Sequence, residues 1–215
     1  MLLRRYLMMA QQTSNKFELV YDAVRGVLPT AAAKGWRRFA NPWNNQFGNG
    51  TQKITDGVLN LHNGHQYERQ GYHPIEHDYA NNCEMCVIFK NDLTCNVIIH
   101  LTDGANSAMG IINQNTFRVG VNNVAHYLRK YQTNITLKEV NTFRVVKKGS
   151  KAEYYLNDEL LYTQTELYNI NDISTGGAGT ETVPNNNGFI LERINAISFG
   201  YNGDIAVLGF TYKEW

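Results

Sequence analysis

The chain has 215 residues, with 20 Lys and Arg against 19 Asp and Glu, so its net charge is close to zero. This balance lacks the overall basic excess that is typical of a nucleic-acid-binding domain, and for the local basic pairs Arg37-Arg38 and Lys147-Lys148 solvated strand ends are favoured over a basic patch. No apolar run approaches the roughly 20 residues of a membrane-spanning helix, so we expect neither a nucleic-acid partner nor a membrane span. The many Asn and Gly residues favour short strands joined by turns around a single core.

The first 35 residues differ from the rest of the chain. Residues 1–10 combine two arginines with Leu and Met, but their apolar part, Tyr6–Ala10, is shorter than the apolar core of about 7 to 15 residues in a signal peptide. We therefore expect this stretch to be retained. Phe17–Arg25 fits neither the helical nor the strand period, and Pro29–Gly35 has the composition of a connector.

Two interpretations of this segment remain open. It forms a strand and a linker of the main domain, or it is a docking segment that orders on a partner. On the second interpretation the chain divides into an N-terminal docking or linker segment, residues 1–35, and a β-domain, residues 36–215.

From Trp36 onward, short apolar and alternating runs between Asn- and Gly-rich turns predict about a dozen strands. Two longer stretches between them, His62–Ala80 and Asn169–Asn187, are predicted to be loops long enough to carry function. The predicted strands are Trp36–Ala40, Lys53–His62, Cys83–Lys90, Thr94–Leu101, Ala108–Asn113, Thr116–Val121, His126–Tyr131, Thr136–Lys147, Ala152–Leu156, Glu159–Gln164, Gly188–Ser198 and Asp204–Lys213.

Three cysteines and a histidine between residues 83 and 100 provide the donor types of a zinc site, but strand alternation argues against one. Pairing Cys83–Lys90 with Thr94–Leu101 as a hairpin places Cys83 and Cys95 at opposite ends of one apolar face. Cys86 then points to the other face. No two sulfur atoms come close enough for a disulfide, which needs Cα atoms within about 7 Å.

We therefore predict three buried, unpaired thiols, no disulfide, no metal and no cofactor. The same register brings Glu84 opposite His100 as a cross-strand pair. An odd number of unpaired thiols favours folding in a cytoplasm.

Asn141–Gln164 predicts a three-stranded meander with turns at Gly149-Ser150 and Asn157-Asp158. In this register Phe143 lies opposite Leu156, and Val145 lies opposite Tyr154. The apolar residues of the first two strands then share one face.

Within this meander, Tyr155–Leu161 resembles the Y-x-N-G-x-L-V hairpin of concanavalin A-like (laminin-G-like) jelly rolls. Thr55–Leu61 is similar to the early D-G-x-L-x-L strand of that family, and Ile194–Tyr212 to its closing hairpin. The resemblance covers about Trp36–Trp215. It implies an all-β, two-sheet antiparallel jelly-roll sandwich with a short N-terminal extension. Such domains often bind glycans and sometimes hydrolyse them, so the fold does not choose between the two.

No catalytic signature accompanies this resemblance. Glucanases of similar fold carry an E-x-D-x-x-E strand that places paired carboxylates on one face, and the sequence contains no such triplet. Its nearest acidic cluster is Glu76-His77-Asp78. The oxygen-rich run Asp103–Asn106 has ligands for calcium, although a plain turn is favoured. We expect a protein that is not an enzyme, with a glycan hydrolase or lyase as the least favoured alternative.

Sugar recognition needs an aromatic platform beside amide and other polar groups, because a pyranose has an apolar face and a hydroxyl rim. The alternative role for each such aromatic residue is to anchor a loop to the core. The candidate ligand-binding residues are Trp43, Asn45, His65, Tyr67, Tyr72, His73, Asn185 and Asn186.

An Asn- and Tyr-rich β-domain with unpaired cysteines, preceded by a basic Leu- and Met-rich opening, also resembles virion proteins of tailed bacteriophages. The resemblance implies a structural capsid-decoration, head-fibre or tail component that binds other virion proteins through its N-terminal segment. Such a protein forms homo-oligomers and displays a surface for cell-surface glycans. The alternative is a bacterial lectin-like carbohydrate-binding module at the cell surface or secreted.

Overall fold

The computed structural model describes residues 17–31, 35–40, 51–62, 70–74, 82–91, 96–102, 107–122, 127–165, 173–176 and 196–215. These residues are almost entirely extended and form two antiparallel sheets. Within them the single helical element is a 3-10 turn, η1 (Ala23–Arg25), which Asp22 caps by accepting a hydrogen bond from the Val24 backbone nitrogen. The all-β prediction is confirmed.

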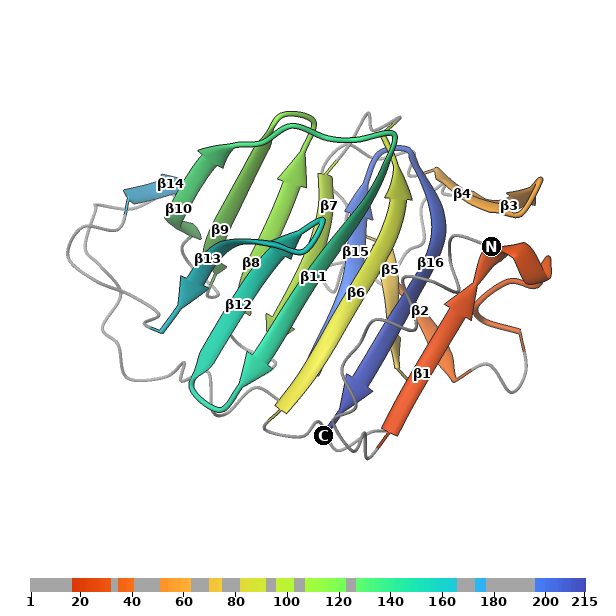
Figure 1. Ribbon diagram of the computed structural model, residues 1–215, viewed down its shortest axis with the longest axis horizontal. Coiled ribbons are helices and arrows are strands. Elements are labelled where there is room, and N and C mark those ends of the chain that lie inside the picture. Colours follow the sequence, from red (N-terminus) through yellow and green to blue (C-terminus); the bar gives the residue numbers. More distant parts are fainter. Residues whose placement is uncertain are drawn as a thin grey trace.

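The first sheet, sheet A, has the strand order β13-β12-β11-β6-β16-β4-β3 (Figure 1). The strand β1 pairs with the second half of β16, while β4 pairs with its first half on the same side. The bounds of these strands are β1 Phe17–Asp22, β3 Thr51–Thr55, β4 Val58–His62, β6 Asn82–Lys90, β11 Val140–Lys148, β12 Lys151–Leu156, β13 Glu159–Gln164 and β16 Ile205–Glu214.

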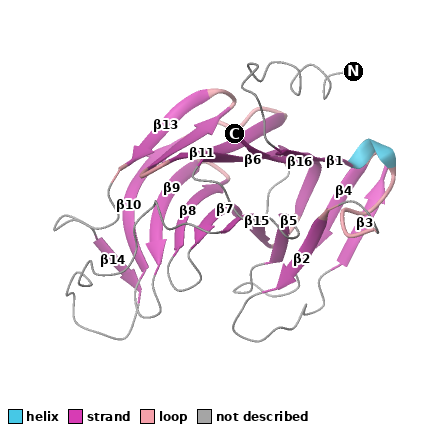
Figure 2. Ribbon diagram, turned by 90° about the horizontal axis from the view of Figure 1, so that it is seen from below, coloured by secondary structure: helices cyan, strands magenta, loops and turns pink. Residues whose placement is uncertain are grey.

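The second sheet, sheet B, has the order β14-β10-β9-β8-β7-β15-β5-β2. Figure 2 shows the two sheets as separate layers, which is the antiparallel jelly-roll sandwich that the sequence predicts. The bounds of its strands are β2 Trp36–Ala40, β5 Gln70–Pro74, β7 Asn96–Thr102, β8 Ser107–Asn113, β9 Thr116–Asn122, β10 Tyr127–Asn134, β14 Ile173–Gly176 and β15 Ala196–Asn202.

Aromatic rings join the two sheets. Phe210 of β16 lies 4.6 Å from Trp36, 5.2 Å from Tyr72 and 5.6 Å from Phe199, measured between ring centroids, and all three partners belong to sheet B. Tyr21 of β1 packs on the same ring at 4.6 Å. A second group forms where Phe117 of sheet B meets aromatic residues of β11 and β12. One continuous core results.

The predicted meander is confirmed residue by residue. Phe143 pairs with Leu156 and Val145 with Tyr154. The second turn has positive φ angles at Asn157 (51°) and Asp158 (67°), a conformation that these residue types tolerate best after glycine.

The segment before residue 36 contributes directly to sheet A. All six residues of β1 pair with β16, and Tyr21 and Ala23 are buried. Residues 17–22 therefore follow the first of the two interpretations, a strand of the main domain, and a boundary at residue 35 does not separate them from the sandwich. Residues 1–16 lie outside the described residues, so a docking role for them stays a prediction.

The predicted hairpin of Cys83–Lys90 with Thr94–Leu101 is wrong. The strand β6 pairs with β11 and β16 in sheet A, whereas β7 pairs with β8 and β15 in sheet B. The inward faces are as predicted, but they meet across the core instead of side by side. Glu84 and His100 therefore lie on different sheets, and Glu84 pairs with Arg144 at 3.2 Å.

The closing hairpin expected within Ile194–Tyr212 is wrong for the same reason. Its two strands, β15 and β16, belong to opposite sheets. The predicted strand Lys53–His62 is instead a hairpin of β3 and β4, with a turn at Asp56 (φ 51°) and Gly57 (φ 73°).

Each of the two predicted loops contains a strand. The strand β5 lies within His62–Ala80, and β14 lies within Asn169–Asn187. Gly71 and Pro74 obscure β5 in the sequence, because neither residue type is typical of a strand interior.

The burial of the cysteines predicts that their thiols react slowly in the native protein. Cys83 and Cys86 are buried and not disulfide-bonded, and burial raises the pKa of each thiol to about 12. At pH 8 both should therefore resist a thiol reagent in the native protein, since the thiolate is the reactive form. Mass-spectrometric mapping of the denatured, unreduced chain should find all three cysteines labelled, including Cys95, which lies outside the described residues. Labelling of only one would contradict the prediction.

Candidate functional site

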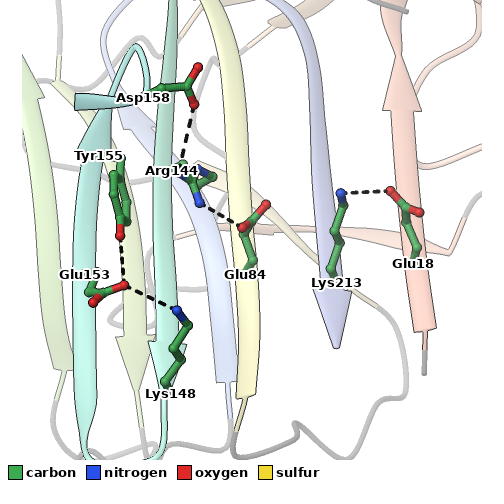
Figure 3. Close-up of polar contacts among 8 residues, drawn as sticks. All are labelled: Glu18, Glu84, Arg144, Lys148, Glu153, Tyr155, Asp158 and Lys213. Atoms are coloured by element: carbon green, nitrogen blue, oxygen red, sulfur yellow. Dashed lines mark hydrogen bonds and ion pairs between the residues drawn. The ribbon is translucent and has the colours of Figure 1, made fainter. Parts of the chain in front are cut away.

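The outer face of sheet A carries charges that neutralise one another (Figure 3). Lys213 of β16 lies 3.4 Å from Glu18 of β1, and Lys151 lies 2.5 Å from Glu153. The hydrogen bond from Lys151 holds the pKa of Glu153 below its usual range. These pairs leave little net charge for a ligand on this face.

Arg144 forms the centre of this network. Its guanidinium pairs with Glu84 and lies 4.1 Å from the centroid of the Tyr155 ring, with Asp158 at 3.9 Å. The Tyr155 hydroxyl in turn donates a hydrogen bond to Glu153. The Tyr155 ring, the Arg144 guanidinium and the neighbouring carboxylates interact with one another. Sheet A is therefore the weaker candidate for a binding face.

The outer face of sheet B is the stronger candidate. Val97, Ile99 and Leu101 of β7 belong to the core between the sheets, so the alternate residues of β7 point away from sheet A. The same reasoning applies to its neighbouring strands. We call the following residues face B: Arg37, Gly71, His73, Asn96, Ile98, His100, Thr102, Met109, Ile111, Asn113, Thr116, Arg118, Gly120, Ser198 and Gly200.

Face B has an apolar centre. Ile98, Met109 and Ile111 form a hydrophobic cluster separate from the main core, and each is 4 % exposed or less although it points away from sheet A. Asn96 and Asn113 lie at one end of this cluster, where the Asn113 side-chain nitrogen donates to the Asn96 oxygen at 2.7 Å.

Polar side chains of intermediate exposure extend from this centre across the sheet. His100 pairs in register with Met109 on one side and with Ser198 on the other. Beyond Ser198, the strand β5 contributes His73, which pairs with the exposed Arg37 of β2. The result is a row of hydrogen-bonding groups beside the buried apolar cluster.

The hydrogen bond of His73 determines which of its ring nitrogens carries the proton. Its Nδ1 lies 2.8 Å from the Pro74 carbonyl oxygen, and since a carbonyl only accepts, Nδ1 carries the proton and donates it. Burial lowers the pKa of His73, which the nearby Arg37 lowers further. Near pH 7 the ring is therefore neutral, with Nε2 as a hydrogen-bond acceptor.

The structure describes two of the sequence-predicted binding residues, and these two lie in different environments. His73 lies on face B. Tyr72 is fully buried, stacks on Phe199 and Phe210, and contacts the Gln52 side chain at 2.5 Å through its hydroxyl. Tyr72 thus takes the alternative role, an anchor in the core. The other predicted residues lie outside the described residues: Trp43, Asn45, His65, Tyr67, Asn185 and Asn186.

Gln52 links the Tyr72 hydroxyl to the guanidinium of Arg38. With its amide oxygen toward Arg38, the side chain accepts hydrogen bonds from Nη1 at 2.7 Å and Nε at 3.1 Å, and its nitrogen donates to the Tyr72 hydroxyl. This polar bridge connects β3 of sheet A with β2 and β5 of sheet B.

The sequence prediction placed the candidate binding residues in loops. It therefore did not include the polar residues of face B, among them Asn96, Asn113, Arg118 and Ser198. A signal for them is present in the sequence. Each occupies the alternate position of a strand whose other positions are apolar, so they are expected to share one outward face once the strands are placed in one sheet.

The zinc ligands considered above are not brought together. Cys83 faces the core and Cys86 the outer side of sheet A, while His100 lies on sheet B. Within the described ranges no cluster of three or more potential metal ligands occurs. Both Glu76–Asp78 and Asp103–Asn106 lie outside them. In the same part of the chain, no helix has the length and hydrophobicity to span a membrane.

No protein-family model and no curated protein sequence matches the chain. Solved structures do match its fold. A structure from work on human gut microbiota that express endo-acting O-glycanases to initiate mucin breakdown superposes with a TM-score of 0.58 at 10 % identity, covering 94 % of this chain and 100 % of the other.

Two further structures are similar over nearly the whole chain. A Bacillus subtilis protein of unknown function with a galectin-like fold has a TM-score of 0.55 at 8 % identity and covers 94 % of this chain and 96 % of its own. The CBM2 module of the evolved Dit protein of Lactobacillus casei BL23 phage J-1 has a TM-score of 0.51 at 10 % identity, with coverage of 93 % and 94 %. Together with the two-sheet topology, these similarities identify the fold as a concanavalin A-like, galectin-like jelly roll.

Proposed function

We propose that this chain is a glycan-binding β-sandwich that performs no turnover, and that its ligand lies on face B. The observation that carries the proposal is the row of partly or fully exposed amide, imidazole, hydroxyl and guanidinium groups on face B, beside the buried cluster of Ile98, Met109 and Ile111. The hydroxyl rim of a sugar ring offers hydrogen-bonding partners for such groups.

The similar structures support binding to glycans without assigning it. One is a CBM2 module of a phage Dit protein, and another comes from work on O-glycanases. The second reminds us that this fold also supports hydrolysis. Binding without hydrolysis is favoured here because the sequence lacks the E-x-D-x-x-E strand and because the described strands of sheet B contain no Asp or Glu, whereas glycoside hydrolysis requires a pair of carboxylic acids.

We propose further that the domain is displayed on a virion as a capsid-decoration, head-fibre or tail component. The phage Dit module of similar fold supports this proposal, as does the basic, Leu- and Met-rich opening of the chain. On this proposal the N-terminal residues attach the protein to other virion proteins, and homo-oligomers present several copies of face B. Repetition strengthens weak individual contacts through effective concentration. A bacterial cell-surface or secreted lectin-like module is the alternative.

A blocking substitution tests the location of the site. Ser198→Tyr introduces a ring at the centre of face B, whereas Thr163→Tyr introduces the same ring on β13 of sheet A. On a glycan array, the wild-type and Thr163→Tyr proteins should bind the same glycans, and Ser198→Tyr should lose at least about tenfold in affinity by steric exclusion.

A polysaccharide hydrolysis assay on the same preparations should remain silent. Product release would contradict the absence of turnover, and release that survives in a Glu76→Ala, Asp78→Ala double variant would place catalysis away from that acidic cluster. Equal binding by all three proteins on the array would contradict the assignment to face B.

A further inference from the structure

We infer that face B selects acidic, carboxylate-bearing polysaccharides over neutral ones. The inference rests on the proposed function and specifies its ligand class.

Among the described strands, carboxylates are confined to sheet A. The eight described strands of sheet B contain no Asp or Glu, whereas face B carries Arg37 and Arg118, and Arg129 and Lys130 stand in the sequence of β10. The strands of sheet A contain acidic residues that pair with its own cations. A chain with a net charge of +1 thus has one neutralised face and one that is cationic in its described part.

Arg118 is the cation nearest the apolar patch. It pairs in register with Ile111 of β8 and with Gln132 of β10, so no acidic residue lies beside it on either neighbouring strand. Its Nε is buried and makes no hydrogen bond among the described residues. Because Nε is enclosed by protein atoms, a ligand carboxylate would accept a charge-assisted hydrogen bond from a terminal nitrogen of the guanidinium.

Arg37 provides a second cation at the other border of face B. It lies on β2, five strand spacings from β9 in the order of sheet B, which corresponds to roughly 24 Å along the sheet. Between the two arginines lie hydrogen-bonding groups without a carboxylate, including His73, His100 and Ser198. Two cations at such a distance suit a polymer with repeated carboxylates better than a single sugar, because one chain can engage both ends.

The matched probes for this inference are polygalacturonate and its methyl ester, which differ in the charge of the same sugar. The wild-type protein should bind polygalacturonate at least about tenfold more tightly than the ester, and the preference should shrink with added salt. Arg118→Gln should lower the affinity for polygalacturonate by about tenfold, as expected for one charge-assisted hydrogen bond, and leave that for the ester nearly unchanged. Arg37→Gln should act in the same direction with a smaller effect, because that side chain is exposed.

Arg25→Gln is the control, because it removes the same charge from an exposed residue of η1, away from sheet B. Loss of affinity in this variant equal to that in Arg118→Gln would overturn the inference in favour of non-specific charge attraction. Equal binding of polygalacturonate and its ester would overturn the selectivity while leaving glycan binding on face B intact. Stronger binding of dextran sulfate than of carboxymethyl dextran would overturn the choice of carboxylate. Failure to bind either form of polygalacturonate would also overturn it, and the glycan array with Ser198→Tyr would then show whether the proposed function fails as well.

Discussion

Replacing Phe210 with alanine should lower the free energy of unfolding by about 3 to 5 kcal/mol, the range typical of Phe→Ala in a core. The Phe210 ring is fully buried and contacts rings of β1, β2, β5 and β15. Its removal therefore leaves a cavity where the two sheets are joined. Chemical denaturation followed by tryptophan fluorescence is suited to the measurement, because the buried Trp36 lies against the ring.

Leu160→Ala is the matched control, since Leu160 is 50 % exposed and its truncation should change stability by no more than about 0.5 kcal/mol. A similar small change for Phe210→Ala would mean that the sheets are joined elsewhere. An altered dependence on denaturant concentration would instead indicate a change in the unfolded state.

Gly71→Ala should destabilise the protein by about 3 kcal/mol, at the upper end of the cost of overpacking. A Cβ atom at residue 71 would lie 1.9 Å from the Phe199 carbonyl oxygen and 2.7 Å from the Gly200 Cα. Both are backbone atoms of β15, so no side-chain rotation relieves the contact and the two strands must separate. Because His73 follows on the same strand, glycan affinity should fall together with stability.

Gly149→Ala separates this steric effect from the backbone preference of glycine. Gly149 has a φ of 55°, but nothing lies within 4 Å of an added Cβ, so alanine there should cost only about 1 kcal/mol. If thermal unfolding shows equal losses for the two variants, the contact between β5 and β15 is not the cause.

The sequence determined the elements whose signals are local. Positive-φ residues at Asn157-Asp158 and at Gly149 specify their turns, and a turn of fixed length sets the register of the strands on either side. Strand alternation likewise predicted that Cys83, Val87 and Phe89 face inward, which the core confirms. The similarity of these local motifs to a jelly roll was sufficient to predict the two-sheet fold.

The candidate site was predicted less well than the fold, because the binding residues were expected in loops. Of the two predicted residues that the structure describes, His73 lies on face B and Tyr72 lies in the core, although they are neighbours on β5. A single residue step reverses the direction of a side chain in a strand. The prediction missed β5, so it had no means to distinguish the two environments.

Only the tertiary structure decided which strands pair and thus which residues share a face. The strands β6 and β7 are adjacent in sequence and both apolar, yet they belong to opposite sheets, as do β15 and β16. Alternation has the same period whether two strands lie side by side or face each other across a core, so it cannot reveal which connection crosses between sheets. That choice comes from contacts distant in sequence, such as those of Phe210 with Trp36 and Tyr72. It places every acidic strand residue of the described chain on sheet A and leaves sheet B without a carboxylate.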